Sequence, residues 1–393
     1  MTPSWDVIVV GAGPAGLMAA RALADAGRAV LVLEEHERIG YPVHCTGLVG
    51  LEAFDELSLP RAPIRAVLTR AAFHGPDEPT PENGPVFVDT DRIRAAVVDR
   101  GEFDAAVAAQ ASARGAGFRL GTRVERVWVD RSGVSVAASG GSLLRGRACV
   151  LACGASYRFN RALGLGVPSA LVQSAQVEVP FEAAANVDIY LSRALASGGF
   201  GWVVPFQRGG SPWARMGLMC RDRAPARFAA LAARVCRERH LAASPPRPRL
   251  KALPLGPVGR TYTDRIVAVG DAAGLVKPTT GGGIYYSLLS GALAAQVLDD
   301  ALQRDQLDAG ALARYEALWR ERLGPDIRAG AAFRTLATRL DDRAVRALLD
   351  LARVDGLIPL LKDQGDFNWH RRAVIALFRH AGFRRAVLSS LWS

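Results

Sequence analysis

The sequence lacks several features that would place the protein outside the cytoplasm or around a metal. No apolar run approaches the length that spans a bilayer, and no basic region with a cleavage site precedes the first strand-like segment. The cysteines have neither the density of a disulfide scaffold nor the paired spacing of a zinc site; they are Cys45, Cys149, Cys153, Cys220 and Cys236. We therefore expect a cytoplasmic protein without a structural metal.

Lysine is almost absent from a strongly basic chain. Only Lys251, Lys277 and Lys362 occur, so arginine supplies nearly all of the formal net charge of +11. Such a charge suits nucleic acid, an anionic membrane surface or an acidic ligand, although a GC-rich genome would also explain the arginine bias. Because the basic residues are spread along the chain without a nucleic-acid-binding motif, we expect no nucleic-acid partner.

The start of the chain contains a nucleotide-binding pattern. Residues 6–34 read DVIVVGAGPAGLMAARALADAGRAVLVLE, which predicts a buried strand, a glycine turn, a helix and a second strand closed by Glu34. The glycine spacing lets backbone N–H groups approach a pyrophosphate at the helix N-terminus. The turn residues are Gly11, Gly13, Pro14, Ala15 and Gly16. Glu34 would accept hydrogen bonds from ribose hydroxyls and repel a 2′-phosphate, which favours FAD or NAD over NADP.

A second glycine-rich segment favours FAD over NAD. In VAVGDAAGLVKPTTGGGI, a buried strand ends at Gly270-Asp271, where the carboxylate can accept from a ribityl hydroxyl that NAD lacks. A helix then begins, and its free N–H groups would stabilise negative charge on the reduced flavin. The residues at this helix entry are Gly281, Gly282, Gly283 and Ile284. Two distant segments around one long ligand predict non-covalent FAD.

The remaining patterns alternate between helix and strand. They predict a helix over 91–115, alternating strands over 118–129 and 133–138, and a buried strand near 147–152. A helical insertion near 224–240 interrupts a proline-richer, strand-rich region, and the chain beyond 308 is helical.

We therefore expect an α/β protein, α+β overall, of 393 residues in more than one unit. A Rossmann-like FAD-binding domain would be interleaved with a mostly antiparallel β-sheet substrate domain and followed by C-terminal helices. The expected ranges are 1–65, 91–165 and 263–307 for the first, 66–90 and 166–262 for the second, and 308–393 for the third.

Together with YPVHCTG, residues 41–47, these motifs resemble the geranylgeranyl reductase family, flavoproteins related to p-hydroxybenzoate hydroxylase. The resemblance covers roughly residues 5–300. It implies that the loop of Cys45 and Gly47 lies beside the flavin ring, that Arg100 approaches the cofactor, and that Val124 contacts adenine through its backbone. Cys45 would deliver a proton to the substrate or shape the pocket, unless it is only a packed thiol.

The family's substrate-pocket pattern appears here as Phe200-Gly-Trp202-Val-Val-Pro205. With Tyr285, these are the expected substrate-binding residues, although Phe200 and Trp202 also suit the core of a sheet. The family's tyrosine hydroxyl is missing at Phe200, so the substrate stays open among a geranylgeranyl lipid, a pigment side chain and menaquinone. Residues 152–154, Ala-Cys-Gly, replace the Asp-Gly pair of many flavin hydroxylases, which leaves the electron donor open among NAD(P)H, ferredoxin and quinol.

The tail WHRRAVIALFRHAGFRRAVLSSLWS is basic and contains no acidic residue. It would form either an amphipathic helix on an anionic bilayer or a surface helix with one face packed on the protein. A lipid substrate would favour a peripheral position at the inner face of the membrane.

We expect an FAD-dependent oxidoreductase that reduces C=C bonds of a prenyl chain. One rival is an FAD-dependent monooxygenase of an apolar or aromatic substrate. Another is a flavin-binding, membrane-associated protein without catalysis.

Overall fold

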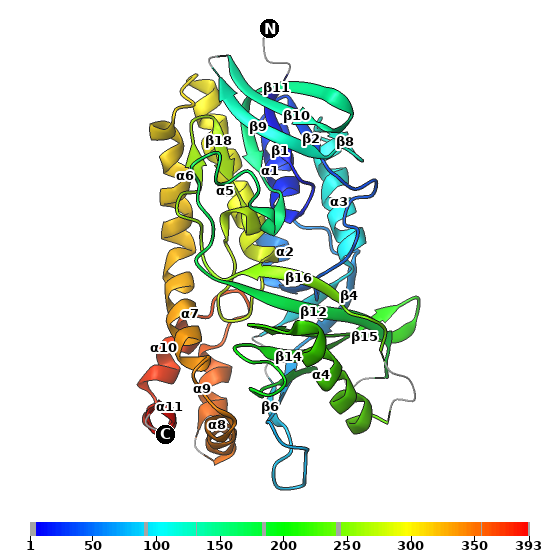
Figure 1. Cartoon of the computed structure of the whole chain (residues 1–393), viewed down its shortest axis with the longest axis vertical. Helices are drawn as coiled ribbons and strands as arrows, with labels where there is room; N and C mark the ends of the chain where they lie inside the picture. Colours follow the sequence, from blue (N-terminus) through cyan, green and yellow to red (C-terminus); the bar gives the residue numbers. More distant parts are fainter. Residues whose placement is uncertain are drawn as a thin grey trace.

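The computed structural model of the chain describes residues 5–89, 93–130, 132–182, 186–240, 245–354 and 356–391, with side chains to residue 387. A mainly parallel sheet with helices occupies one end of the molecule, and a broad antiparallel sheet crosses the other end (Figure 1). Helices from the C-terminal part run along one side of both. Segments far apart in the sequence therefore meet between the two sheets.

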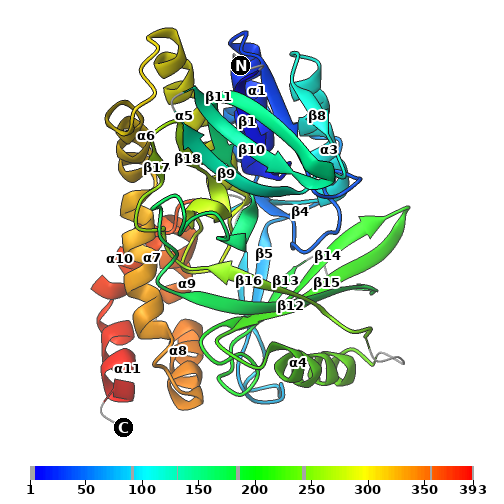
Figure 2. The same cartoon turned by 45° about the horizontal axis from the view of Figure 1, so that its top comes forward.

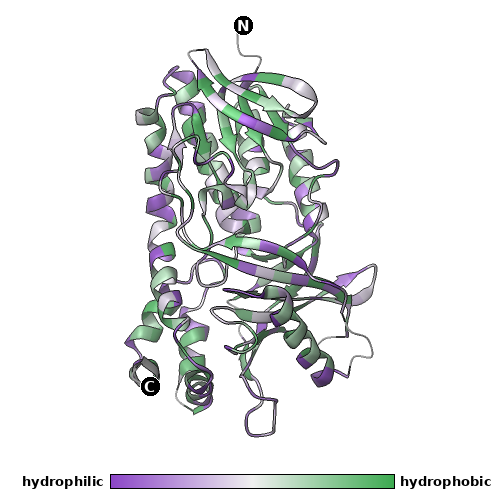
Figure 3. Cartoon of the chain, viewed as in Figure 1, coloured by the Kyte–Doolittle hydropathy of each residue, from purple (hydrophilic) through white to green (hydrophobic). Residues whose placement is uncertain are grey.

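The first sheet carries the nucleotide-binding pattern. Its strands are β1 Trp5–Val10, β2 Val30–Leu33, β8 Gly117–Arg119, β9 Val124–Asp130, β10 Gly133–Ala138, β11 Ser142–Leu151, β17 Tyr262–Thr263 and β18 Ile266–Ala268. The order is β17-β18-β11-β1-β2-β8; β10 pairs antiparallel with β11, and β9 pairs antiparallel with β10. Residues 7–10 are buried because helices cover the sheet, which explains their unbroken apolar run. In Figure 3, hydrophobic colours dominate these strands, whereas hydrophilic residues recur along the outer helices.

Three helices pack beside this sheet (Figure 2). They are α1 Pro14–Asp25, α3 Arg100–Ser112 and α5 Ile284–Gln303, and short 3₁₀ turns occupy Ser139–Gly141, Gly154–Ser156 and Gly270–Ala273. Helix α5 approaches α1 so closely that a Cβ at Gly291 would lie 2.2 Å from the Ala15 carbonyl oxygen. This contact fixes the first turn of α1 against the helix that follows the second glycine segment.

Two predicted elements have different bounds. The helix expected over 91–115 begins only at Arg100, because Asp99 caps it by accepting from the Glu102 N–H at 3.0 Å. The preceding residues form β7, Ala95–Val98, which is buried between two neighbouring strands. The strand expected over 118–129 is divided by a turn in which Gly121 has a φ of +61°. Residues 91 and 92 of the expected helix lie outside the described part.

The second sheet is antiparallel except where β13 and β5 pair in parallel. Its order is β16-β12-β15-β14-β13-β5-β6, with β5 Arg70–His74, β6 Val86–Asp89, β12 Leu171–Pro180, β13 Val187–Tyr190, β14 Phe200–Arg208, β15 Ser211–Cys220 and β16 Arg249–Pro254. Helix α4, Ala224–Glu238, packs on it. A small third sheet comprises β3 Leu48–Gly50, β4 Ile64–Leu68 and β7, with α2 Glu52–Glu56 beside it, and shares a hydrophobic cluster with β14.

The C-terminal helices are α6 Ala309–Arg322, α7 Gly324–Ala337, α8 Asp342–Val354, α9 Leu357–Gln364, α10 Arg371–Arg379 and α11 Ala381–Leu391. The apolar residues Phe378, Phe383 and Val387 of the basic tail pack among these helices. The tail arginines are exposed. The tail thus forms two short helices whose apolar residues pack on the protein. None of the helices in the described residues is long and apolar enough to cross a membrane.

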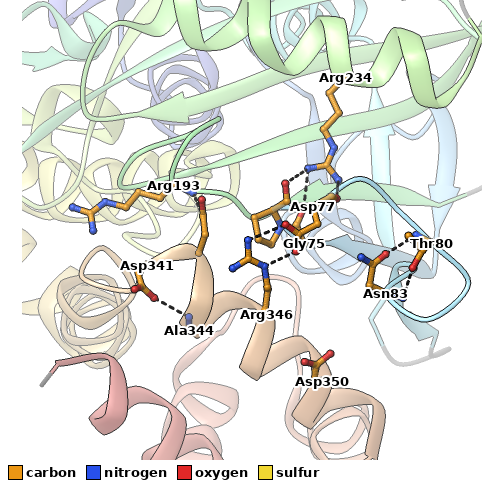
Figure 4. Close-up of polar contacts among 12 residues, drawn as sticks. Gly75, Asp77, Thr80, Asn83, Arg193, Arg234, Asp341, Ala344, Arg346 and Asp350 are labelled. Atoms are coloured by element: carbon orange, nitrogen blue, oxygen red, sulfur yellow. Dashed lines mark hydrogen bonds and ion pairs between the residues drawn. The ribbon is translucent and has the colours of Figure 1, made fainter. Parts of the chain in front are cut away.

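Polar contacts join these helices to the antiparallel sheet (Figure 4). Arg346 of α8 forms an ion pair with Asp77, which lies in the loop between β5 and β6. Arg234 of α4 donates to the carbonyl oxygens of Gly75 and Asp77 at 2.9 and 2.7 Å. The same loop is thus attached to both α4 and α8.

Candidate functional site

The glycine turn after β1 creates space at the carboxyl ends of the parallel strands. Gly11 has a φ of +107°, and a Cβ there would lie 2.4 Å from the Ala152 carbonyl oxygen. A Cβ at Gly16 would lie 2.1 Å from the Gly11 oxygen, whereas one at Gly13 would meet nothing within 4 Å. The first and third glycines therefore let chain segments touch, and the middle one borders open space.

Glu34 is held at the edge of this space. Its Oε2 accepts from the Ala12 N–H at 2.8 Å, and its Oε1 accepts from the His36 N–H at 3.0 Å. The His36 ring Nδ1 lies 2.6 Å from the same Oε1. The carboxylate is fixed beside the glycine turn, where its charge can face ribose hydroxyls.

Asp271 and the start of α5 come from the second glycine segment. The Asp271 Oδ2 lies 3.2 Å from Nζ of Lys251, a residue of β16. A Cβ at Gly283 would lie only 3.0 Å from Oδ1 of Asp271. Because α5 begins at Ile284, the N–H groups of its first turn have no intrahelical partner. A carboxylate, an ammonium group and a helix N-terminus thus meet at one place.

The loop of Cys45 is attached to the first turn of α3. The Cys45 Sγ accepts from the Gly47 N–H at 3.4 Å, and Arg100 contacts both this sulfur and the Asp104 carboxylate, the latter at 2.7 Å. Burial alone would lower the pKa of Arg100, but the charges of Asp104 and Cys45 raise it above its ordinary value. Arg100 therefore places a permanent positive charge beside the thiol.

These segments line one cavity of about 420 Å³. Among the expected cofactor residues, its lining contains Gly11, Gly13, Pro14, Ala15, Glu34, Cys45, Arg100, Val124, Asp271, Gly281, Gly283 and Ile284. The buried Nδ1 of His44 also lies in this cavity wall, without a hydrogen-bond partner in the described residues. Burial, followed by the charges of Lys251 and Arg249, lowers the pKa of His44, so the ring is neutral at pH 7. We call this space the cofactor cavity.

The cofactor cavity fits an elongated dinucleotide. Gly13 borders open space where a phosphate could approach, and the fixed carboxylate of Glu34 and the N-terminus of α5 line the same cavity. The unpaired His44 nitrogen offers a further polar contact. These groups suit the phosphates, ribose and flavin ring of FAD.

A second cavity, of about 280 Å³, lies between the antiparallel sheet and the C-terminal helices. Its lining is mainly aliphatic and aromatic and comes from β5, β6, residues 191–200 and α7 to α11. Phe200 is part of it, as is Thr279. Since Gly281 lines the cofactor cavity, one short loop borders both spaces. We call the second space the apolar cavity.

Comparison with known proteins assigns the family. Residues 4–143 match the FAD binding domain family. Digeranylgeranylglycerophospholipid reductase 2 of Methanopyrus kandleri is 30% identical over 387 residues, covering 92% of this chain and 93% of the relative. The chain belongs to the geranylgeranyl reductase family. It is an FAD-dependent oxidoreductase.

Solved structures share the fold. A geranylgeranyl bacteriochlorophyll reductase-like protein from Thermoplasma acidophilum has a TM-score of 0.85 over 99% of both chains, at 22% identity. The halogenase PltM, solved with FAD, has a TM-score of 0.69, at 17% identity, over 99% of this chain and 91% of the halogenase. The same fold thus accompanies different reactions, and the activity has to be argued from the cavities.

Gly16, Gly47 and Gly282 were expected to bind the cofactor but do not line the cavity. They pack next to residues that do. Gly16 packs against the Gly11 carbonyl, and Gly47 has a φ of +71° with its Cβ position 2.4 Å from the Val98 oxygen. The Gly282 N–H donates to the Thr280 hydroxyl at 3.3 Å. Val124 lines the cavity, but its carbonyl oxygen accepts from Arg158. Val124 thus lies where an adenine contact was expected, with one hydrogen bond already made by its carbonyl oxygen.

Of the expected substrate residues, only Phe200 lines either of the two cavities. Trp202 is buried, with its ring against Gly217 and its Nε1 donating to Gln176 Oε1 at 3.3 Å. Pro205 lies further along β14, opposite Ala214. Tyr285 is buried in α5 and donates its hydroxyl proton to Glu56 Oε2 at 2.6 Å. Trp202, Pro205 and Tyr285 therefore make contacts within the protein and do not line either cavity.

Sequence reasoning missed two contributors to the site. Lys251 reaches Asp271 from the antiparallel sheet, and its rarity among the basic residues was the available signal. The wall that α7 to α11 add to the apolar cavity was also missed. Helical spacing indicates which face of a helix is apolar but not what that face contacts.

Proposed function

We propose that the protein reduces isolated C=C bonds in the prenyl chain of a lipid that lies in the apolar cavity. The observation that carries this proposal is the loop between Thr279 and Gly281, which borders the apolar cavity on one side and the cofactor cavity on the other. A long hydrocarbon held in the apolar cavity would have its reacting end beside the cofactor. The M. kandleri relative, named for a digeranylgeranyl glycerophospholipid, supports a substrate of this class.

The chain's own residues would bind and orient the two reactants. Bound FAD supplies the hydride for such a reduction. The aliphatic lining excludes water, which strengthens every electrostatic interaction at the cofactor edge. The first-turn N–H groups of α5 favour negative charge next to them. Glu34 and Asp271 would accept hydrogen bonds from ribose and ribityl hydroxyls of the cofactor.

Cys45 is our candidate for the group that protonates the second alkene carbon. Its sulfur lies in the cofactor cavity wall, and two donors, the Gly47 N–H and the Arg100 guanidinium, can stabilise the thiolate that remains after proton transfer. His44 is neutral and adjacent in sequence, but its unpaired nitrogen does not contact this sulfur in any recorded hydrogen bond of the described residues. Cys45 is therefore a better candidate proton donor than His44, because two hydrogen-bond donors can stabilise its thiolate.

The test is anaerobic. The FAD-loaded protein is reduced chemically and mixed with a polyprenyl phospholipid or menaquinone, and flavin reoxidation is followed together with the mass of the lipid. We expect a mass gain of two per double bond, and at least about a hundredfold slower reoxidation for Cys45→Ala at unchanged flavin content. No reoxidation by any prenyl compound, with oxygen-dependent hydroxylation instead, would favour a monooxygenase. An unchanged rate for Cys45→Ala would remove the thiol from the mechanism.

We also propose that contact with an anionic membrane occurs through charge rather than insertion. The arginines of α10 and α11 are exposed, whereas Phe378, Phe383 and Val387 pack inside the protein. Such contact is screened by salt. Sedimentation with anionic vesicles should therefore fall steeply between low and physiological ionic strength, and salt-insensitive binding would contradict this mode.

A further inference from the structure

Three arginines beside the apolar cavity form no ion pair with a carboxylate in the described part of the chain. Arg334 of α7 and Arg193 line the cavity, and Arg221 follows β15. We call Arg193, Arg221 and Arg334 the arginine cluster. Arg334 and Arg221 meet at Gly198, whereas Arg193 belongs to the same loop and lines the same cavity.

Arg334 is the most enclosed member. Its Nη2 donates to the Gly198 carbonyl oxygen, and its Nη1 lies 3.4 Å from the Pro278 carbonyl oxygen. Both acceptors are neutral. Burial, followed by the charge of Arg221, lowers the pKa of Arg334 to about 10, because these surroundings disfavour its cationic form. The guanidinium is still protonated at neutral pH, and no carboxylate among the described residues forms an ion pair with it.

Arg221 and Arg193 add to the same positive field. A Cβ at Gly198 would lie 3.7 Å from the Arg221 Cβ and 3.8 Å from its Nε. Arg221 and Arg193 are both exposed. Asp342 meets the backbone N–H of Arg193 at 2.6 Å rather than its guanidinium. Figure 4 shows the Arg193 side chain extending away from the pair of Asp77 and Arg346.

Other arginines in this region have acidic partners. Arg346 pairs with Asp77, Arg227 with Asp222 at 3.0 Å, and Arg234 with Glu238 at 2.7 Å. Within the described part of the chain, the arginine cluster therefore differs from its neighbours in having no acidic partner. A partly buried cation without a counterion is costly, and guanidinium groups bind phosphate through paired hydrogen bonds.

We infer that the arginine cluster binds the phosphate of a prenyl lipid whose hydrocarbon chain occupies the apolar cavity. This inference rests on the proposed function for the chain but assigns a separate site to the headgroup. Ser192, Thr279 and Thr338 also line the cavity and add polar groups to its otherwise apolar wall. The ligand is thus amphiphilic, with an anion at the arginine cluster and an apolar chain directed among the helices.

The test compares two lipids with the same chains: digeranylgeranylglyceryl phosphate and digeranylgeranylglycerol, which lacks the phosphate. Binding to the oxidised, FAD-loaded protein in neutral detergent is measured by fluorescence, so no turnover is required. We expect the wild type to prefer the phosphate lipid by at least about tenfold, and Arg334→Met to lose most of this preference without weakening the neutral lipid. Arg221→Met, at an exposed position, should lose a smaller part.

Arg328→Met is the matched control. Arg328 lies on the same helix, is exposed and does not line the cavity, so its removal makes the same change in net charge without touching the site. Flavin content and Tm verify folding, and Arg221→Met carries the test if Arg334→Met does not fold. Equal weakening of both lipids by the cluster variants, or no wild-type preference for the phosphate lipid, would overturn the inference. Displacement by inorganic phosphate at lipid-like concentration would overturn the assignment to a headgroup.

Anaerobic turnover with the same two lipids separates this inference from the proposed function. If Arg334 determines the preference in binding but neither lipid is reduced, the headgroup site stands and the proposed reaction fails. If both lipids are reduced with equal KM and the cluster variants change nothing, the reaction stands and the headgroup site fails. If the inference holds, Arg334→Met should raise KM for the phosphate lipid about tenfold with little change in kcat.

Discussion

The cofactor cavity and the apolar cavity differ in how their walls are built. The cofactor cavity is formed by turns. In these turns, glycines allow close backbone contacts and carboxylates place negative charge at fixed positions. The second is made of side chains from several helices and strands, most of which could be exchanged for others of similar volume. A site formed by backbone contacts should lose its ligand when a single atom is added at a close contact. A site lined by side chains should lose affinity gradually as side-chain volume changes. Four changes test this difference.

Gly11→Ala should have the largest effect. The added Cβ would lie 2.4 Å from the Ala152 oxygen at a φ of +107°, so β1 and β11 would have to separate. We expect loss of bound FAD and destabilisation of more than about 4 kcal/mol. Flavin absorbance and chemical denaturation measure both. Gly115→Ala is the control, because Gly115 has a φ of +100° but nothing within 4 Å of its Cβ position; it should cost only about 1–2 kcal/mol. Equal costs would show that backbone contact does not matter.

Arg100→Met should come next. It leaves the buried Asp104 carboxylate unpaired and removes the charge beside Cys45, which should cost about 3–5 kcal/mol in free energy of unfolding. Arg114→Met breaks the exposed pair of Arg114 and Asp25 and should cost less than about 1 kcal/mol. Urea titrations of the two variants give the comparison. Similar losses in both would contradict the role of burial at Arg100.

His370 makes a pH-dependent contribution where the two cavities meet. Its Nδ1 lies 2.5 Å from the hydroxyl of Thr279, and burial, followed by the charge of Lys277, lowers its pKa to about 3. The folded state therefore resists protonation that the unfolded state accepts, so stability is lost as pH falls below the unfolded pKa of about 6.5. Between pH 6.5 and 5 the wild type should lose up to about 2 kcal/mol from this group. In His370→Gln, the free energy of unfolding should fall less between pH 6.5 and 5 than in the wild type, as measured by denaturation curves. The same pH dependence in both proteins would contradict this role of His370.

Ala352→Phe should have the smallest effect on the folded protein and a selective effect on the lipid. Ala352 lines the apolar cavity, so the larger ring takes space from the prenyl chain. We expect KM for a prenyl phospholipid to rise about tenfold, with flavin content unchanged. Ala347→Phe, at an exposed position of α8 that does not line the cavity, should leave KM unchanged. Steady-state reoxidation assays measure the difference, and equal KM values would exclude chain binding there.

The same difference explains what the sequence could predict. Gly11 and Gly16 act through backbone geometry, and Glu34 and Asp271 follow directly after buried strands, so local sequence spacing indicates where they lie. The β7 strand was mistaken for helix because a short alanine-valine run does not distinguish the two, and only its pairing with β3 and β4 decides. Tyr285 was expected at the substrate, but the turn of α5 directs its hydroxyl to Glu56. The arginine cluster could not be predicted, because only the tertiary fold brings Arg193, Arg221 and Arg334 to the same side of the apolar cavity.

The most direct measurement locates the prenyl chain in the FAD-loaded protein. A phospholipid with a photoreactive group in its prenyl chain is cross-linked to the protein and the labelled peptides are mapped by mass spectrometry, with unlabelled lipid as competitor. Our account predicts competed labels on residues 191–200 and on α7 and α8, which line the apolar cavity. Competed labels confined to other surfaces, with none on these elements, would contradict it.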